Sequence, residues 1–338
     1  MNKITSISCA FFVSSCLLSG TAMASETVTV DNFVRAESDR TLKAYVDKGA
    51  FGKFAHAREV TPVDKQDVIR MNRDTLYSFG IFDLTTPVTV TKPDSGGRFQ
   101  SLQIVSQDHS MPPSENGPGE FTYTQEDIGT RYVFLLIRTF VDPNDPEDVK
   151  AAHAAQDAIA SQQEDVGKFD VPDWDADSIT PIRQSLNLLA STVEDKSGFF
   201  GDTNEIDPIH HLLGTAYGWG GNPKEAAIYV GMEPEKNDGT TPHAVTVKDV
   251  PVDGFWSITM YNKEGYMEPN DQNAYSFNDV TAEENEDGGI TINFGGCDDG
   301  RVNCLPITDG WNILARLYVP GEEILDGSWT FPEPEVAQ

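Results

Sequence analysis

Basic residues are scarce in this sequence of 338 residues. There are 24 Lys and Arg against 54 Asp and Glu, which gives a formal net charge of −30 at pH 7. A field of this sign repels phosphate backbones and anionic lipids, so we expect neither nucleic acid nor an anionic membrane surface as a partner. A saline habitat would also favour such a surface, but a hydrated acidic surface without a specific partner is the simpler interpretation.

Long apolar runs are also missing, since none reaches the roughly 18–20 residues that a membrane-spanning helix needs. The N-terminal stretch MNKITSISCAFFVSSCLLSGTAMA has Lys3, a short apolar segment and an Ala-x-Ala ending at Ala24. This order is typical of a secretory signal peptide over residues 1–24, cleaved after Ala24. A lipoprotein cleavage at Cys16 is the alternative, which the following residues disfavour. We therefore expect a periplasmic or secreted protein.

Cysteine is rare, because Cys9 and Cys16 leave with the signal peptide and only Cys297 and Cys304 remain. Both lie in the short stretch GGCDDGRVNC. In an oxidising compartment such a pair is typical of one loop-closing disulfide. A metal site would need further His or Cys nearby, and this stretch has none, so the sequence predicts no metal here.

Motifs of high specificity are absent as well. The sequence has no G-x-S-x-G, no H-E-x-x-H, no phosphate-binding Gly loop and no dinucleotide fingerprint; GWGGNP at 218–223 is better explained by a helix end and a turn. Asp173, Asp175 and Asp177 alternate as in a calcium loop, but Ser178 and Gln184 occupy the positions where Gly and Glu are required. We therefore predict no cofactor.

Strand patterns dominate two parts of the chain. After a helical segment at 31–49 with Asp31 as its candidate cap, short strands separated by turns run from Met71 to Phe140 and return from Ala244 onward. The clearest are VTVT (88–91), RFQSLQIVSQDH, RYVFLLIRTF, AVTV, FWSITMYN, GITINF and WNILARLYV.

Helix start signals predict that the middle of the chain is helical. Asp145-Pro146, Thr180-Pro181 and Asp207-Pro208 each place a capping side chain before a proline at the first helical position. In the second of these helices, the spacing of Ile182, Leu186 and Leu189 predicts a packing stripe. The sequence thus predicts a mainly β protein, with a β domain at 25–142, a helical connector at 143–222 and a second β domain at 223–338.

Two arginines are embedded in apolar strands, Arg138 in YVFLLIRTF and Arg316 in WNILARLYV. A buried guanidinium is costly unless it is paired, so each predicts a carboxylate partner, with Asp74, Asp83 and Asp108 as candidates. The functional alternative is a clamp for an anionic ligand, because the arginine fork matches carboxylate and phosphate groups.

His109 ends a strand beside Asp108 and is the best candidate for a general base in the chain. Adjacent strand residues point to opposite faces, so Asp108 need not orient it; Asp74 is the other candidate. A hydrogen-bonded structural histidine is the alternative. For His210 and His211, about 100° apart on a helix, we expect packing or capping.

The stretch NRDTLYSFGIFDLTTPVTVTKPDSGGRFQSLQIV resembles the domain-of-unknown-function family numbered 1254. PVDGFWSITMYNKEGYMEPN, RLYVP and ILDGSWTFP resemble the family numbered 1214, although Cys304 stands where many members have Trp. The resemblance implies an immunoglobulin-like and a jelly-roll-like β domain with helices at the join, and it implies no activity. The residues that coincide with the family motif are Asn72, Arg73, Asp74, Thr75, Tyr77, Asp83 and Arg98.

Three roles remain open at this stage: binding of a small, including an anionic, ligand at or between the β domains; hydrolysis of a small ester or amide; and a structural envelope role, for which we keep a homo-oligomer open. The catalytic candidates are His109, Asp108 and Asp74, with Arg73 to stabilise negative charge. The ligand-binding candidates are Asn72, Arg73, Tyr77, Arg98, Arg138, Trp256 and Tyr261.

Overall fold

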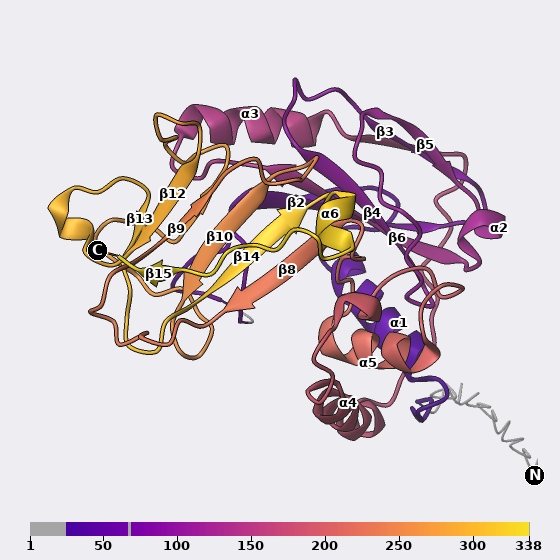
Figure 1. Ribbon diagram of the computed structural model, residues 1–338. Helices are drawn as coiled ribbons and strands as arrows, with labels where there is room; N and C mark the ends of the chain where they lie inside the picture. Colours follow the sequence, from indigo (N-terminus) through magenta and orange to yellow (C-terminus); the bar gives the residue numbers. More distant parts are fainter. Residues whose placement is uncertain (1–24, 67–68, 338) are drawn as a thin grey trace, which may run out of the picture.

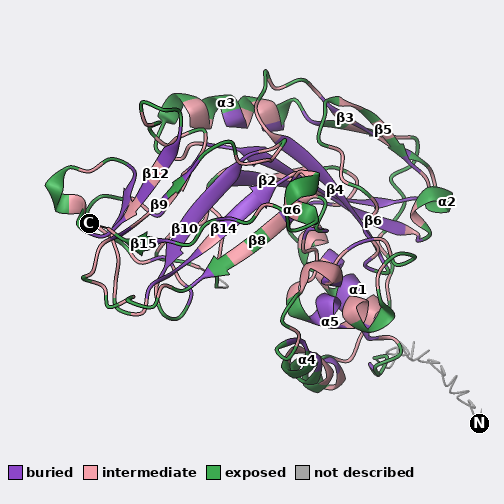
Figure 2. Ribbon diagram, in the orientation of Figure 1, coloured by how far each residue is buried: buried purple, intermediate pink, exposed green. Residues whose placement is uncertain are grey.

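A computed structural model describes residues 25–66 and 69–337 and confirms a mainly β protein with four sheets (Figure 1). The predicted signal peptide lies outside these residues. Burial is concentrated on the central strands of the sheets, as Figure 2 shows in purple. No helix in the described part of the chain has the length and apolar character to cross a membrane.

The N-terminal β unit is built from two antiparallel sheets, of order β1-β2-β6-β4 and β5-β3-β7. Their facing side chains, among them Val90, Leu102 and Leu135, form one hydrophobic core. All nine residues of β6 are buried, because both of its faces are covered, and this explains its continuous apolar run. The bounds are β1 (Phe54–Ala57), β2 (Thr75–Asp83), β3 (Val88–Lys92), β4 (Gln100–Ser106), β5 (Gly119–Tyr123), β6 (Tyr132–Phe140) and β7 (Ala160–Gln163).

The C-terminal β unit also pairs two sheets, of order β11-β10-β14-β8 and β13-β12-β9-β15. Its core contains Trp311, Phe294 and Ile313. The predicted strands at 244–247, 255–262, 289–294 and 311–319 are confirmed. The bounds are β8 (Ala227–Met232), β9 (His243–Val247), β10 (Trp256–Tyr261), β11 (Ser276–Asn278), β12 (Ile290–Phe294), β13 (Cys304–Leu305), β14 (Asn312–Tyr318) and β15 (Glu335–Val336).

Helices α1, α4 and α5 lie together at one end of the molecule (Figure 1), and α1 also contacts β2. They pack around Phe33, Phe199 and Leu213. The helices are α1 (Phe33–Val46), α2 (Gln125–Ile128), α3 (Pro146–Asp157), α4 (Ala176–Ala190), α5 (Pro208–Gly218), α6 (Glu322–Leu325) and the 3₁₀ helices η1 (Ser197–Phe199) and η2 (Cys297–Asp299). At α1 the N-cap is Asn32, without a side-chain cap, so the predicted cap Asp31 is wrong.

Two of the three predicted helix starts are confirmed, since Asp145 and Asp207 accept hydrogen bonds from the first-turn N–H groups of α3 and α5. The third is wrong. Helix α4 begins at Ala176 with Asp175 as its cap, and Pro181 lies inside the helix. The side-chain oxygen of Asp175 accepts the N–H of Asp177 and so starts the helix before Thr180 is reached.

The early start of α4 also changes which of its residues are buried. Leu186 is buried as predicted, but Leu189 is 56% exposed. The buried residues of α4 are Ile179, Leu186 and Ala190, so the packing stripe begins three residues before the predicted one.

The segment at 143–222 is not only helical. Strand β7 pairs with β3 over Ala160–Gln163 and completes the three-stranded sheet of the N-terminal unit. This segment therefore contributes to the first core as well as to the group of helices. Its other expected turn, GWGGNP, is confirmed at the end of α5, where Gly220 has a φ of 76° that favours glycine.

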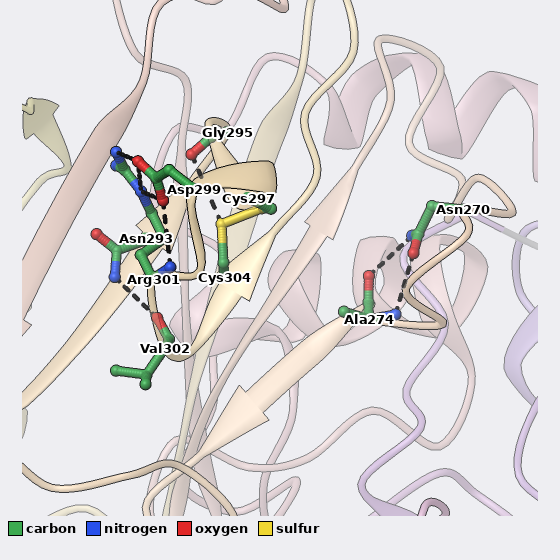
Figure 3. The surroundings of a disulfide bond; sticks show 9 residues. All are labelled: Asn270, Ala274, Asn293, Gly295, Cys297, Asp299, Arg301, Val302 and Cys304. Carbon is green, nitrogen blue, oxygen red and sulfur yellow. Dashed lines mark hydrogen bonds and ion pairs between the residues drawn. A yellow bond between two sulfur atoms is a disulfide. The ribbon is translucent and has the colours of Figure 1, made fainter.

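The predicted disulfide is confirmed between Cys297 and Cys304, whose Cα atoms lie 5.5 Å apart (Figure 3). It closes the loop that contains η2, where Asp299 accepts hydrogen bonds from the guanidinium of Arg301. Within residues 25–66 and 69–337, no group of three or more His, Cys, Asp or Glu side chains could hold a metal ion.

Candidate functional site

The two β units meet through the polar stretch that precedes β2. The side-chain oxygen of Asn72 accepts the N–H groups of Asp74 at 2.5 Å and Thr75 at 3.2 Å, which fixes the turn into β2. Its amide nitrogen donates to the hydroxyl of Tyr318 on β14 at 2.5 Å. Asn72 thus joins the N-terminal unit to the C-terminal sheet.

Asp74 and Arg316 are both buried at this junction. Asp74 is fully buried and accepts a hydrogen bond from Ser257 on β10 at 2.7 Å. Burial raises the pKa of Asp74 above its usual value, while the nearby Arg316 opposes that rise. Arg316 is 2% exposed and donates to Thr259, to the hydroxyl of Tyr261 at 2.6 Å and to the carbonyl of Arg70 at 2.9 Å.

Arg138 lies on β6 directly opposite Tyr77 on β2 and is 8% exposed. One terminal nitrogen, Nη1, donates to the side-chain oxygen of Gln103 at 2.8 Å. The amide nitrogen of Gln103 donates to the carbonyls of Gly220 and Gly221, so the amide is held with its oxygen toward Arg138. The guanidinium lies 5.9 Å from the centre of the Tyr77 ring.

Among the described residues, neither Arg138 nor Arg316 forms a direct ion pair. The predicted carboxylate partner is therefore wrong for Arg138, whereas the predicted Asp74 acts on Arg316 as a nearby opposite charge. The acceptors are neutral oxygens instead. Asp83 pairs with Arg131 and Asp108 with Arg35. Asp74 lies close enough to Arg316 to compensate its charge, but the direct hydrogen bond goes to Ser257.

Arg138 has N–H donors that bind no described residue. Its Nε and Nη2 groups form no hydrogen bond with any described residue. Neither atom is among the fully buried polar atoms that lack a hydrogen-bond partner. The hydroxyls of Tyr45 and Tyr77 also form no hydrogen bond with a described residue and are not fully buried, whereas the hydroxyl of Tyr123 is buried without a partner. Solvent therefore reaches these donors of Arg138, Tyr45 and Tyr77.

Two further tyrosines add hydroxyl donors beside them. Tyr318 accepts from Asn72, and Tyr229 on β8 accepts from Asn222 at 2.6 Å; no described residue accepts from either hydroxyl. We call Arg138, Tyr45, Tyr77, Tyr229 and Tyr318 the arginine–tyrosine cluster.

Electrostatic influences on the pKa values link the members of the cluster through Tyr77. Burial raises the pKa of Tyr45; Tyr77 adds to the rise and Arg138 opposes it. Burial also raises the pKa of Tyr318 well above its usual value, with further increases from Tyr229 and Tyr77. Burial thus favours the protonated hydroxyl at Tyr45 and Tyr318. The arrangement is rich in donors and poor in acceptors.

Comparisons with known proteins place this cluster across two families. Residues 227–322 match the family described as "Protein of unknown function (DUF1214)", and residues 51–120 match "Protein of unknown function (DUF1254)". The chain joins a DUF1254 segment to a DUF1214 segment. Tyr77 lies in the first segment and Tyr229 and Tyr318 in the second, while Tyr45 and Arg138 lie outside both.

One solved structure has a similar fold. The crystal structure of the VPA0106 protein from Vibrio parahaemolyticus is similar over 91% of this chain and 100% of that chain, with a TM-score of 0.69 and 19% identity. A putative uncharacterized protein from Burkholderia cenocepacia is similar over 91% of this chain and 88% of that chain, with a TM-score of 0.49 and 13% identity. No curated protein matches the chain significantly.

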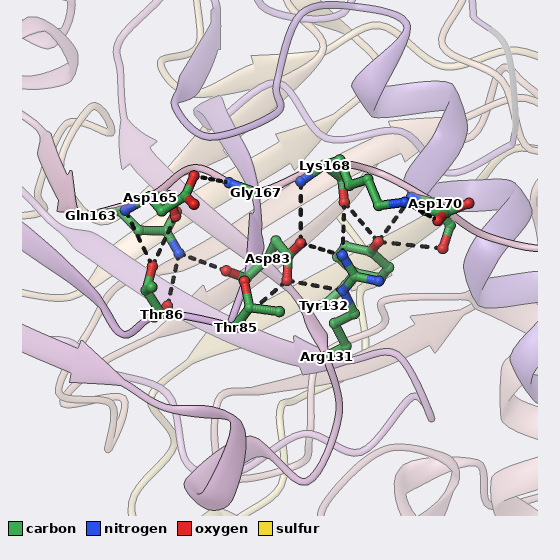
Figure 4. Close-up of polar contacts among 10 residues, drawn as sticks. All are labelled: Asp83, Thr85, Thr86, Arg131, Tyr132, Gln163, Asp165, Gly167, Lys168 and Asp170. Carbon is green, nitrogen blue, oxygen red and sulfur yellow. Dashed lines mark hydrogen bonds and ion pairs between the residues drawn. The ribbon is translucent and has the colours of Figure 1, made fainter.

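Within the DUF1254 segment, Asp83 belongs to a closed polar network (Figure 4). Its carboxylate accepts from Arg131 at 2.6 and 3.0 Å and from the N–H groups of Thr85 and Lys168. Burial raises the pKa of Asp83, but the hydrogen bond from Arg131 and the backbone donors outweigh it, so the pKa is lowered. The network ties β2 to the segment that follows β7.

Four other ligand candidates lie outside the arginine–tyrosine cluster. Arg98 pairs with Asp148 and donates to the carbonyl of Phe140, and Arg73 donates to the carbonyl of Thr61. The remaining two belong to the DUF1214 segment. Trp256 is buried in its core, and Tyr261 donates to the carbonyl of Met71 beneath Arg316.

His109 is buried beside the turn at Gly220, whose carbonyl binds Gln103, but it forms no hydrogen bond with a member of the arginine–tyrosine cluster. Its Nε2 accepts the N–H of Gly220 at 2.9 Å, and its Nδ1 lies 2.9 Å from the hydroxyl of Thr215, which itself donates to the carbonyl of His211. This pattern requires the neutral ring with its proton on Nδ1. Burial lowers the pKa of His109 to about 3, and His211 adds to the effect. Both ring nitrogens are therefore engaged, which disfavours a general base here.

Two cavities, of about 450 and 270 Å³, lie elsewhere. Four carboxylates line the larger one, against Lys224 and His210, so it repels anions. The smaller one is lined by Lys92 and Arg98. Lys92 donates to the carbonyls of Gln100 and Glu115, and burial lowers its pKa to about 8. These lysine contacts serve the packing of β3 and β4.

Sequence patterns did not identify four members of the site: Tyr45, Gln103, Tyr229 and Tyr318. Tyr229 alternates with Ile228 and Val230 along β8, so strand periodicity could have placed it on the face away from the core. Nothing local signals that Tyr45, on a helix, meets Tyr77 and Arg138.

Proposed function

We propose that the protein binds a small organic anion between its two β units, with Arg138 as the anchor. One observation carries this proposal: the solvent-reached donors of the arginine–tyrosine cluster have no acceptor among the described residues. A guanidinium that is largely removed from water without a carboxylate is costly, so an anion that supplies the missing acceptors would stabilise it.

The geometry around Arg138 supports an oxyanion in particular. Gln103 holds Nη1, which leaves the Nε and Nη2 edge of the guanidinium available. That edge presents two nearly parallel N–H groups, which match two oxygens of one anionic group. The hydroxyls of Tyr45 and Tyr77 are additional donors beside it.

We further propose that the protein is exported, with residues 1–24 as its signal peptide. The disulfide between Cys297 and Cys304 supports an oxidising compartment. We keep the boundaries 25–142, 143–222 and 223–338, with an immunoglobulin-like and a jelly-roll-like unit, as proposals; the two sheets that face each other in each β unit support them.

Calorimetric titration of small organic acids and inorganic phosphate against the mature chain tests the binding proposal. We compare the wild type with Arg138→Gln, whose amide can still face Gln103, and with the control Arg301→Gln, which removes the same charge at an exposed ion pair. An anion should bind the wild type and the control, and about a hundredfold more weakly to Arg138→Gln, because two charge-assisted hydrogen bonds are lost. Equal affinity for all three proteins would refute Arg138 as the anchor.

A further inference from the structure

The charges around the arginine–tyrosine cluster limit the charge of its ligand. Arg316 lies close to the buried Asp74, so these two groups compensate each other. Arg138 is the only Lys, Arg, Asp or Glu residue of the cluster. Arg138 therefore contributes one uncompensated positive charge, which one negative charge balances. A dianion would leave an excess negative charge in a partly desolvated place on a protein of net charge −30.

The donors limit the geometry of the anionic group. Because Gln103 occupies Nη1 and covers one side of the guanidinium, the available edge is flat and carries two N–H groups. A carboxylate is planar and fits such an edge with both oxygens. A phosphate has three or more oxygens to satisfy and is better served by donors on several sides, as at a helix N-terminus or a backbone nest.

Aromatic rings beside Arg138 limit the chemistry of the uncharged part of the ligand. Tyr77 and Phe79 are both half-buried and lie on the same face of β2, because they are two residues apart. Half-buried Tyr45 packs against them from α1, with its ring centre 4.9 Å from that of Phe79 and 5.0 Å from that of Phe134. A row of partly exposed rings thus begins at Arg138 and runs along β2. Such rings prefer a flat π system in offset or edge contact.

From the charge of the cluster, the geometry of the free guanidinium edge and the row of aromatic rings, we infer that the ligand is an aromatic monocarboxylate. Its carboxylate binds Arg138, and its ring packs against Tyr45, Tyr77 and Phe79. This inference rests on the proposed anion-binding function and narrows it to one chemical class. Neither an amide nor a phosphate satisfies all three limits.

Calorimetric titration of five probes into the mature wild-type chain tests the inference: benzoate, benzamide, cyclohexanecarboxylate, phenylphosphonate and inorganic phosphate. We expect benzoate to bind, benzamide not to bind, and cyclohexanecarboxylate to bind about fivefold more weakly, since an aromatic contact contributes about 1 kcal/mol beyond burial. Tyr45→Leu should reduce the preference for benzoate over cyclohexanecarboxylate. Its melting temperature reports whether it folds, and the wild-type series decides the question if it does not.

The outcomes separate the two claims. Equal affinity for benzoate and cyclohexanecarboxylate, or tighter binding of phenylphosphonate or phosphate than of benzoate, overturns the aromatic monocarboxylate and leaves anion binding in place. Binding of benzamide as tight as that of benzoate overturns the requirement for charge and with it both claims. Failure of every probe to bind the wild type also counts against both.

Discussion

The carboxyl of Asp279 should destabilise the folded protein at neutral pH. Asp279 is half-buried just after β11 and accepts the N–H of Trp256 at 3.2 Å. Burial raises its pKa from 3.8 to about 6, and the neighbouring Asp74 adds to the rise. The favourable contribution of the neutral acid is therefore fully present below pH 3.8 and is lost as the pH rises through 6.

The size of this destabilisation follows from the shift in the pKa of Asp279. A change from 3.8 to about 6 corresponds to roughly 3 kcal/mol at 1.36 kcal/mol per unit. Solvent screens a half-buried carboxylate, so we expect about 1–2 kcal/mol. Asp279→Asn keeps an oxygen for the N–H of Trp256 and removes the charge. Its free energy of unfolding should equal that of the wild type near pH 4 and exceed it by about 1–2 kcal/mol at pH 7.

Urea unfolding of the mature chain, followed by tryptophan fluorescence at pH 4, 5, 6 and 7, measures this difference. Asp271→Asn is the matched control, because it removes the same charge from an exposed position of the same region. A constant difference between Asp279→Asn and the wild type over the whole pH range would refute the titration of Asp279 as its cause.

Two further predictions concern the junction and the disulfide. Asn72→Ala should lower the free energy of unfolding by about 2–4 kcal/mol, since it removes three hydrogen bonds at a partly buried turn; urea unfolding with little loss of stability would contradict the role of Asn72 as a clamp. Replacing Cys297 and Cys304 together by Ser should cost about 2 kcal/mol, the loop entropy for a sequence separation of 7, and reducing agent should no longer change the urea midpoint of that variant.

Local patterns in the sequence predicted the elements well where one signal acted alone. Asp145 and Asp207 each cap a helix whose first residue is the following proline. Before Thr180-Pro181 there is a competing cap, Asp175, and the helix begins at the earlier of the two signals. Pro181 is tolerated there because it removes a single hydrogen bond near the helix start.

The site was harder to predict, because its members come from distant parts of the chain. The charge of Arg138 within an apolar strand singled it out as a candidate. Its partner, however, is the amide of Gln103 rather than a carboxylate, and the orientation of that amide depends on two carbonyls in the turn after α5. No local pattern in sequence encodes such a chain of contacts.

The junction between the β units has a consequence for how this chain can be divided. The buried Arg316 of the DUF1214 segment depends on the backbone carbonyl of Arg70, and the buried Asp74 of the DUF1254 segment depends on the hydroxyl of Ser257. A fragment of either half would carry an ionisable group whose partner belongs to the other half. The two segments therefore stabilise each other at this junction, and recombination that exchanged one segment without the other would disturb these contacts.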